Sequence, residues 1–194
     1  MNNLSFKLAF AAIFVVLMAI GANIATWFPL LKVSGVPLTL QTFFAILAGL
    51  LLGKKLGAFS MVAYLAVGAV GIPVFADLSA GVIHFIRPTG GFLISFVFVA
   101  FFVGLIVEKS EESIKTYLIA TFVGLMTNYL IGTPFMYLSL NYVMETSMSL
   151  VTAFQIMIPF FIKDFIITMA AAVVLPQFIT RLTKAVPSLA TTRS

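Results

Sequence analysis

The chain has 194 residues with a formal net charge of +5, and 62% of its residues are hydrophobic while only 9% are charged. A soluble domain carries roughly 25% charged residues because its surface faces water, so this composition excludes a soluble protein. With no Cys and a single His, the sequence also excludes disulfides, thiolate metal sites and multi-histidine metal centres.

Six apolar segments follow one another along the chain. A helix of about 20 residues crosses the ~30 Å hydrocarbon core of a bilayer. The segments are continuously apolar rather than alternating, which favours helices over a β-barrel. We therefore predict a single all-α membrane domain over residues 1–194, with transmembrane helices at 8–28, 38–53, 56–72, 90–107, 115–135 and 152–178. The first segment also has features of a signal peptide, but the five further spans favour a first membrane helix. The tail 187–194 is predicted to be disordered.

The basic residues of the short loops predict the orientation of the chain. An even number of spans places both termini on one side, and eight Lys and Arg residues share that side: Lys7, Lys54, Lys55, Lys109, Lys115, Arg181, Lys184 and Arg193. Only Lys32 and Arg87 lie on the other side. The positive-inside rule then places both termini in the cytoplasm. This bias accounts for the net charge, so no nucleic-acid partner is inferred.

The connections on the outer side are rich in Pro and Gly. The segments 27–39 and 71–91 both have this composition, whereas the cytoplasmic turn at 53–57 is short. Irregular loops that gather on one face are typical of a binding face, so we expect a ligand to enter from outside.

Lys163 and Asp164 interrupt the last apolar segment. Each ionisable residue inside a spanning helix costs roughly 2.5–3.5 kcal/mol on insertion scales, so such residues usually face a protein interior or a wet cavity. Adjacent residues point about 100° apart on a helix, and we therefore expect that they do not simply neutralise each other. Asp164 is predicted to accept hydrogen bonds from a polar ligand; the alternative is a structural pair that reaches headgroups or neighbouring helices.

Arg87 precedes Pro-Thr-Gly-Gly, where irregular backbone leads into a helix start. Free N–H groups near Thr89 and Gly90 favour an anion, and the guanidinium fork of Arg87 matches a carboxylate. The alternative is an interfacial Arg bound to lipid phosphate or to Asp77.

Four further polar residues are candidates for ligand contact, namely Asp77, Ser79, Gln41 and Asn128. Asp77 is equally suited to cap a short helix, and Gln41 to bond between helices. Tyr129 and Tyr137 are polar aromatic residues, and near a membrane interface such residues are more often anchors than ligand contacts. Small residues of the first helix, including Gly21, Ala22 and Ala25, fit either internal packing or docking on another membrane subunit.

No His or carboxylate cluster is available to activate a nucleophile, so we expect no enzyme and no catalytic residue.

Several motifs spread over most of the chain carry a family resemblance. They are Pro37-Leu-Thr-Leu-Gln41, Ala48-Gly-Leu-Leu-Leu-Gly53 with Lys55-Leu-Gly57, Gly71-Ile-Pro-Val-Phe-Ala76, Arg87-Pro-Thr-Gly-Gly-Phe92 and Pro159-Phe-Phe-Ile-Lys-Asp164. In combination they resemble the BioY family, the biotin-binding S components of energy-coupling factor (ECF) transporters.

This resemblance implies a six-helix S component of the cell membrane that binds biotin from outside and has no cofactor. It implies that Asp164 accepts the ureido N–H groups of biotin, that Arg87 binds the carboxylate, and that Ser79, Gln41, Asn128 or Lys163 supply further hydrogen bonds. It also implies a transmembrane T subunit and two ATPase subunits as partners. The alternatives are an S component for another vitamin, or a membrane scaffold protein without a small ligand.

Overall fold

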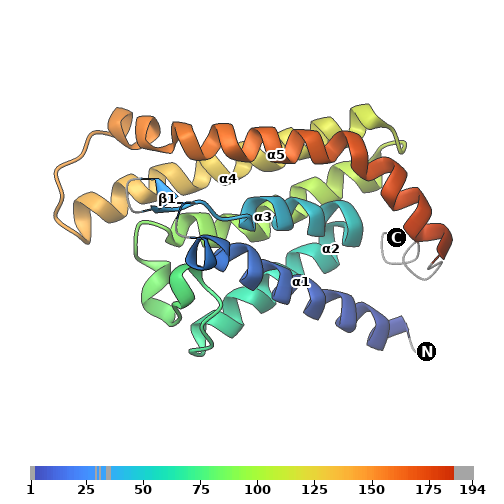
Figure 1. Cartoon of the computed structure of the whole chain (residues 1–194), viewed down its shortest axis with the longest axis horizontal. Coiled ribbons are helices and arrows are strands. Elements are labelled where there is room, and N and C mark those ends of the chain that lie inside the picture. Colours follow the sequence, from blue (N-terminus) through green and yellow to red (C-terminus); the bar gives the residue numbers. More distant parts are fainter. Residues whose placement is uncertain (1–2, 29, 31, 34–35, 186–194) are drawn as a thin grey trace.

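The computed structural model describes residues 3–28, 30, 32–33 and 36–185. Its long helices are α1 (Asn3–Trp27), α2 (Gln41–Ala69), α3 (Gly90–Lys109), α4 (Ile114–Tyr142) and α5 (Leu150–Ala185), and they lie alongside one another as a bundle (Figure 1). Two short strands, β1 (Lys32–Val33) and β2 (Val36–Pro37), pair antiparallel between α1 and α2. Two 3-10 turns, η2 (Ala76–Leu78) and η3 (Val82–Phe85), connect α2 with α3.

The prediction of six separate membrane helices is wrong, because the described chain contains five helices that are long and apolar enough to cross a membrane. The predicted segments 38–53 and 56–72 form the single element α2, in which no loop intervenes. Gly53 alone leaves the helical conformation, with φ 76° and ψ 179°. The sequence Gly-Lys-Lys-Leu-Gly had predicted a turn over 53–57 between two helices; the chain does reverse there, but at Gly53 alone, and the helix resumes at Lys54.

The two limbs of α2 fold back on each other at Gly53. Gln41 Nε2 donates to the hydroxyl of Tyr64 at 2.9 Å, although these residues would lie about 35 Å apart along a straight helix. The Cβ position of Gly57 likewise lies 3.0 Å from the carbonyl oxygen of Ala48. Each limb is therefore in contact with the other along its length.

The reversal at Gly53 is held by a residue of α3. Glu108 accepts a hydrogen bond from the backbone N–H of Lys54 at 2.8 Å through Oε1, and it forms an ion pair with Lys54 Nζ at 2.8 Å through Oε2. The Cβ position of Gly104 is only 2.2 Å from the Lys54 nitrogen, so no larger residue fits there. The carboxylate of Glu108 thus serves as the cap for the second limb of α2.

Small residues allow the helices to approach closely. The Cβ position of Gly49 lies 2.6 Å from the carbonyl oxygen of Ala100, and that of Gly124 lies 2.6 Å from Val103. In a bilayer, where lipid tails are as apolar as Leu, such close packing is the main source of helix association. Ala22 and Ala25 of α1 are fully buried and Gly21 packs on Phe44, so internal packing accounts for these three residues.

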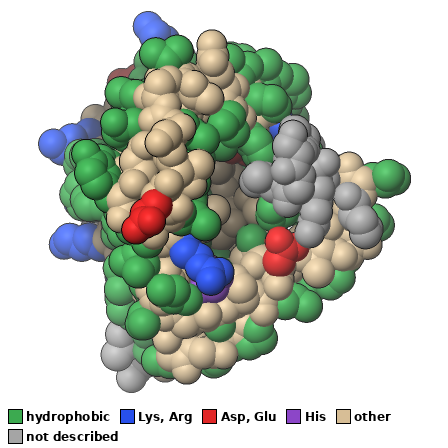
Figure 2. Space-filling model, turned by 90° about the vertical axis from the view of Figure 1, so that its left-hand side faces the viewer, with side chains coloured by type: hydrophobic (Ala, Val, Ile, Leu, Met, Phe, Trp, Pro, Cys, Tyr) green, Lys and Arg blue, Asp and Glu red, His purple; other side chains and the backbone are tan. Residues whose placement is uncertain are grey.

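The bundle has two unlike ends. The start of α1, the end of α5 and the Gly53 reversal lie at one end, which we call the basic end; the strands, η2 and η3 lie at the other, which we call the loop end (Figure 1). The predicted disordered tail, 187–194, lies outside the described residues. Viewed from the loop end, the surface is hollowed at its centre, with acidic, basic and His side chains around the hollow (Figure 2).

Candidate binding site at the loop end of the bundle

Asp164 of α5 lies at the centre of a buried polar cluster. Only 4% of the residue is exposed. Its Oδ2 accepts hydrogen bonds from Thr42 Oγ1 at 3.0 Å and from the Tyr129 hydroxyl at 2.8 Å, and its Oδ1 is paired with Lys163 Nζ at 2.7 Å. A carboxylate away from water is retained only where a counter-charge and hydrogen bonds compensate its lost hydration, and all of these are present.

The ion pair between Lys163 and Asp164 corrects the expectation that adjacent residues do not neutralise each other. Their Cβ atoms point in different directions on the helix, but the four-carbon stem of Lys allows its ammonium group to return to the neighbouring carboxylate. Lys163 Nζ also donates to the carbonyl oxygen of Thr39, just before α2. The pair therefore lies close to the loop end of α2.

Asn128 of α4 extends the cluster to a further helix. Its Nδ2 donates to Thr42 Oγ1 at 3.2 Å, and its Oδ1 accepts from Ser95 Oγ of α3 at 2.7 Å. The cluster thus links α2, α3, α4 and α5 through side chains alone. We refer to Thr42, Ser95, Asn128, Tyr129, Lys163 and Asp164 as the Asp164 cluster.

Three members of the Asp164 cluster were not predicted as site residues. Thr42 directly follows the Pro37-Leu-Thr-Leu-Gln41 motif, and Ser95 lies one turn into α3 after the Gly-Gly pair. Tyr129 was interpreted as a membrane anchor, but only 6% of it is exposed and its hydroxyl binds Asp164. A signal for Tyr129 was present, because it adjoins the candidate Asn128 within one helix.

The Asp164 cluster retains capacity to bind a further polar group. A carboxylate has about four lone-pair sites, and Asp164 uses three of them toward the described residues, while the ammonium group of Lys163 donates two of its three N–H bonds to them. The amide of Asn128 donates one of its two N–H bonds to the described residues. The cluster can therefore accept one hydrogen bond and donate two, which suits a ligand group that carries both donors and an acceptor.

Other predicted site residues make contacts outside this cluster. Gln41 binds Tyr64, whose hydroxyl donates to the carbonyl oxygen of Val74 at 3.0 Å, so Gln41 connects α2 to the following loop. Ser79 donates to the carbonyl oxygen of Ala76 within its own turn. Asp77 accepts from Thr26 at 3.3 Å and lies inside η2 with φ 56°, a left-handed conformation, so it is not the N-terminal cap of a helix. Tyr137, predicted in a loop, lies within α4.

Arg87, Thr89 and Gly90 lie together at the start of α3. Arg87 is exposed and its carbonyl oxygen accepts from Gly90 N–H at 2.8 Å, while Thr89 is the residue before the helix. The Cβ position of Gly90 lies 2.3 Å from the Phe85 carbonyl oxygen, which requires glycine. Within the described residues, no hydrogen bond or ion pair joins Arg87 to the Asp164 cluster. The predicted cation and the predicted acid are therefore separate features of the loop end.

His84 in η3 lies close enough to Arg87 to be affected by its charge. Partial burial and the guanidinium of Arg87 both lower the pKa of His84 below its usual value. The imidazole is therefore neutral at pH 7, and Arg87 is the cationic group of this stretch. Among the described residues, no three His, Asp or Glu side chains lie close enough to share a metal ion.

The comparisons with known proteins agree with the motifs. The BioY family model matches residues 1–184. The putative biotin transporter BioYB of Bacillus subtilis is 41% identical over 179 residues, 92% of this chain and 90% of the relative. The biotin transporter BioY of Thermotoga maritima is 40% identical over 122 residues, 63% of this chain and 69% of the relative.

A solved structure described as the S-component for biotin from an ECF-type ABC transporter matches with a TM-score of 0.67, at 24% identity over 92% of this chain and 93% of that one. This similarity shows the fold. Five apolar membrane helices and the transporter relatives make the chain a multi-pass membrane protein, as the composition predicted. From its motifs and its match over nearly the whole chain, we conclude that the protein belongs to the BioY family.

Proposed function

We propose that this protein takes up biotin, binding it at the loop end of the bundle. Relatives named as biotin transporters support this function, and they agree with the expectation that the chain is not an enzyme. The observation that carries the proposal is the buried Asp164 cluster, which, among the described residues, leaves one acceptor and two donors without a partner inside the bundle.

Biotin has a ureido ring at one end and a carboxylate on an aliphatic tail at the other. We assign the ureido N–H to the remaining lone pair of Asp164, and the ureido carbonyl to Lys163 and Asn128. The carboxylate is assigned to Arg87 and to the start of α3 at Thr89 and Gly90, because a helix start favours anions, although the Gly90 N–H itself donates to the Arg87 carbonyl oxygen. Ser79, Gln41 and Asp77 are assigned to the rim of the same site. Polar groups at the two ends would set the specificity of an otherwise apolar pocket.

The loop end faces the outside of the cell in this proposal. The basic end carries Lys7, Lys54, Lys55, Lys109 and Lys115, together with Arg181 and Lys184 near the end of α5, whereas Lys32 and Arg87 are at the loop end. This asymmetry supports a cytoplasmic basic end by the positive-inside rule.

Transport is proposed to need an ECF transmembrane T subunit and two ATPase subunits. The fold match to an S-component from an ECF-type ABC transporter supports this assembly. Biotin uptake into proteoliposomes, with ATP supplied to the ATPase side, should occur when the four subunits are reconstituted together. Equal uptake by this chain alone would contradict the need for partners.

Binding titrations of the purified protein test the proposal. Three ligands separate the possibilities: biotin, a biotin amide that lacks the carboxylate, and riboflavin. Biotin should bind at one site, riboflavin should not, and the amide should bind more weakly. Binding of riboflavin alone would favour an S component for another vitamin, and binding of none would favour a scaffold protein.

Asp164→Asn provides the residue-level test. It should weaken biotin and its amide alike, because both keep the ureido ring. Glu108→Gln is the matched control, since Glu108 also holds a Lys at 2.8 Å but lies at the basic end. Arg87→Ala should weaken biotin and leave the amide unchanged; equal losses for both ligands would exclude Arg87 from the carboxylate site.

A further inference from the structure

Ser95 of α3 is fully buried, and its hydroxyl lies within reach of two acceptors. Its Oγ is 2.7 Å from the carbonyl oxygen of Phe92 in its own helix and 2.7 Å from Asn128 Oδ1 in α4. A hydroxyl has a single proton, and a bond within its own turn already satisfies it. Ser95 therefore does not need Asn128 as a partner. Asn128 needs Ser95, because its buried amide oxygen has no other donor among the described residues.

The hydrogen bonds between Asp164 and Ser95 run in one direction. Asp164 is a carboxylate paired with Lys163 and can only accept, so Thr42 gives its single proton to Oδ2 at 3.0 Å. The Thr42 oxygen in turn accepts from the amide nitrogen of Asn128 at 3.2 Å. The amide oxygen of Asn128 is thereby turned away from Thr42 and toward Ser95, which completes the chain as a donor.

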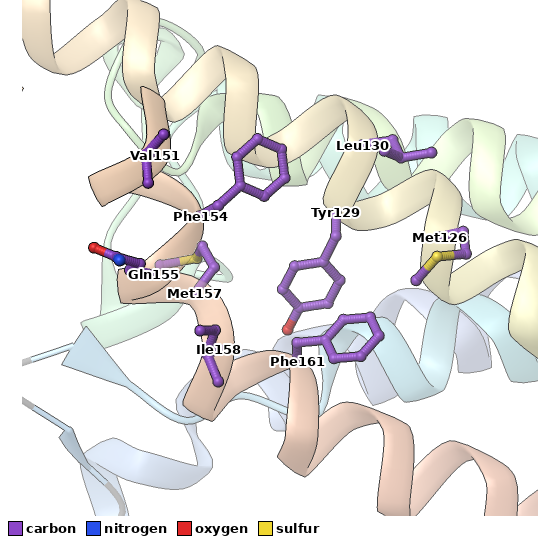
Figure 3. Close-up of a pocket in the computed structure, with 9 residues that line it drawn as sticks. All are labelled: Met126, Tyr129, Leu130, Val151, Phe154, Gln155, Met157, Ile158 and Phe161. Carbon is purple, nitrogen blue, oxygen red and sulfur yellow. The ribbon is translucent and has the colours of Figure 1, made fainter. Parts of the chain in front are cut away.

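The carboxylate of Asp164 is held in place independently of Ser95. Tyr129 donates to its Oδ2 at 2.8 Å, and the Tyr129 ring extends from α4 toward α5, where it packs edge-on against Phe161 with ring centroids 5.2 Å apart (Figure 3). Lys163 holds Oδ1 at 2.7 Å. Loss of the Ser95 hydroxyl would therefore leave Asp164 where it is and release the amide of Asn128.

The orientation of the Asn128 amide decides what this part of the cluster offers to a ligand. While Ser95 holds the oxygen, the amide nitrogen keeps a second N–H, which is the donor assigned above to the ureido carbonyl. Without Ser95 the amide oxygen is buried and unpaired, which is costly, so the amide is no longer held in this orientation. In the reversed orientation an oxygen would stand in place of the N–H and repel the ureido carbonyl.

We propose that Ser95 is a positioning residue for biotin, which holds the amide of Asn128 with its N–H toward the ureido carbonyl and does not itself contact the ligand. This inference rests on the proposed biotin binding. It adds a residue of α3, the helix whose start at Thr89 and Gly90 is assigned to the carboxylate. One helix then serves both ends of the ligand.

Two variants of equal shape test the role of the hydroxyl. Ser95→Thr keeps it, and Ser95→Val replaces it by a methyl group. In titrations of the purified protein, Ser95→Val should bind biotin about tenfold more weakly than Ser95→Thr, the scale of one hydrogen bond. The biotin amide should lose the same factor, because it keeps the ureido ring. Equal affinities of the two variants for biotin would overturn the proposal.

Ser95→Ala removes the same hydroxyl without added bulk, and it decides the matter if the larger side chains do not fit. Ser60→Ala is its matched control, because Ser60 is also fully buried and donates to a carbonyl oxygen of its own turn, that of Leu56 at 2.8 Å. Ser95→Ala should weaken biotin binding about tenfold, whereas Ser60→Ala should leave it unchanged. Equal affinities in these two variants would also overturn the proposal.

A double-variant cycle shows whether Ser95 acts through Asn128. In the Asn128→Leu background, Ser95→Ala should change the affinity for biotin by less than about twofold, because no amide is left for the hydroxyl to hold. A further tenfold loss in that background would show that Ser95 supports the fold in general, and would refute its positioning role while leaving the proposed function intact. If the unchanged protein binds no biotin, the proposed function fails and this inference fails with it.

Discussion

The hydroxyl of Tyr129 offers a direct measure of what the Asp164 cluster contributes to stability. Tyr129→Phe removes one donor from Asp164 Oδ2 and keeps the ring that packs on Phe92 and Phe161. Hydrogen bonds between membrane helices average ~0.6 kcal/mol and reach ~1.7. Hydrogen bonds to charged groups reach ~1.5–3 kcal/mol in proteins generally. Because the acceptor here is a buried carboxylate, we expect the upper part of the membrane range, about 1.5 kcal/mol.

Reversible unfolding in mixed micelles measures this loss. Tyr142→Phe is the matched control, because Tyr142 lies in the same helix and is 77% exposed. The free energy of unfolding should fall by about 1.5 kcal/mol in Tyr129→Phe and stay unchanged in Tyr142→Phe. Equal stability of the two variants would show that the Tyr129–Asp164 bond is not formed in the membrane, and the account of Asp164 orientation would fail with it.

Three further predictions concern the reversal of α2 and the loop end. Gly104→Leu should prevent folding, because its Cβ position is 2.2 Å from the Lys54 nitrogen, and size-exclusion profiles of membrane extracts should show aggregated protein. Gly53→Ala should cost about 1–3 kcal/mol, since φ 76° with ψ 179° is accessible essentially to glycine alone. His84 should titrate below its usual pKa of about 6.5, so its neutral form is favoured in the folded protein and stability should fall as the pH drops below 6.5. NMR of this single His reports its pKa directly, and Arg87→Gln should raise that pKa; a value above 6.5 would contradict the geometry.

The membrane segments were predictable from hydropathy. The hydrocarbon core of a bilayer cannot form hydrogen bonds with exposed backbone, so the segments that cross it are apolar helices. The joint between 38–53 and 56–72 was not predictable in the same way. The sequence there predicts a turn over 53–57, whereas the chain reverses at Gly53 alone because Glu108 of α3 caps the Lys54 N–H. That donor–acceptor pair is separated by 54 residues, so no local pattern contains it.

Some residues of the Asp164 cluster were predictable from the sequence and others were not. Lys163, Asp164 and Asn128 were predicted because polar groups inside a spanning helix are costly and need a partner. Thr42 and Ser95 were missed because a hydroxyl in a helix usually satisfies itself on the preceding turn, as Thr127 does on the carbonyl oxygen of Val123. Only the packing of α2 against α4 and α5 turns Thr42 toward Asp164 and Asn128.

The remaining question is whether the Lys163–Asp164 pair serves stability or binding, and paired variants can separate the two. Removing one partner of a buried ion pair costs about 3–5 kcal/mol of stability because the other charge is left buried and unpaired. Replacing both partners by apolar residues often leaves the stability unchanged. Lys163→Met alone should therefore destabilise the protein strongly. The double variant Lys163→Met with Asp164→Leu should recover most of that stability in the unfolding assay.

Biotin titration then gives the decisive comparison. If the pair is kept for a ligand, the double variant folds well and binds no biotin, because both the free acceptor of Asp164 and the free donor of Lys163 are gone. If the pair only holds helices together, the double variant also recovers its stability, but its affinity for biotin does not change. A stable double variant that still binds biotin with unchanged affinity would show that the ureido group binds outside the Asp164 cluster. The residues of the cluster that this variant retains include no carboxylate to accept from the ureido N–H.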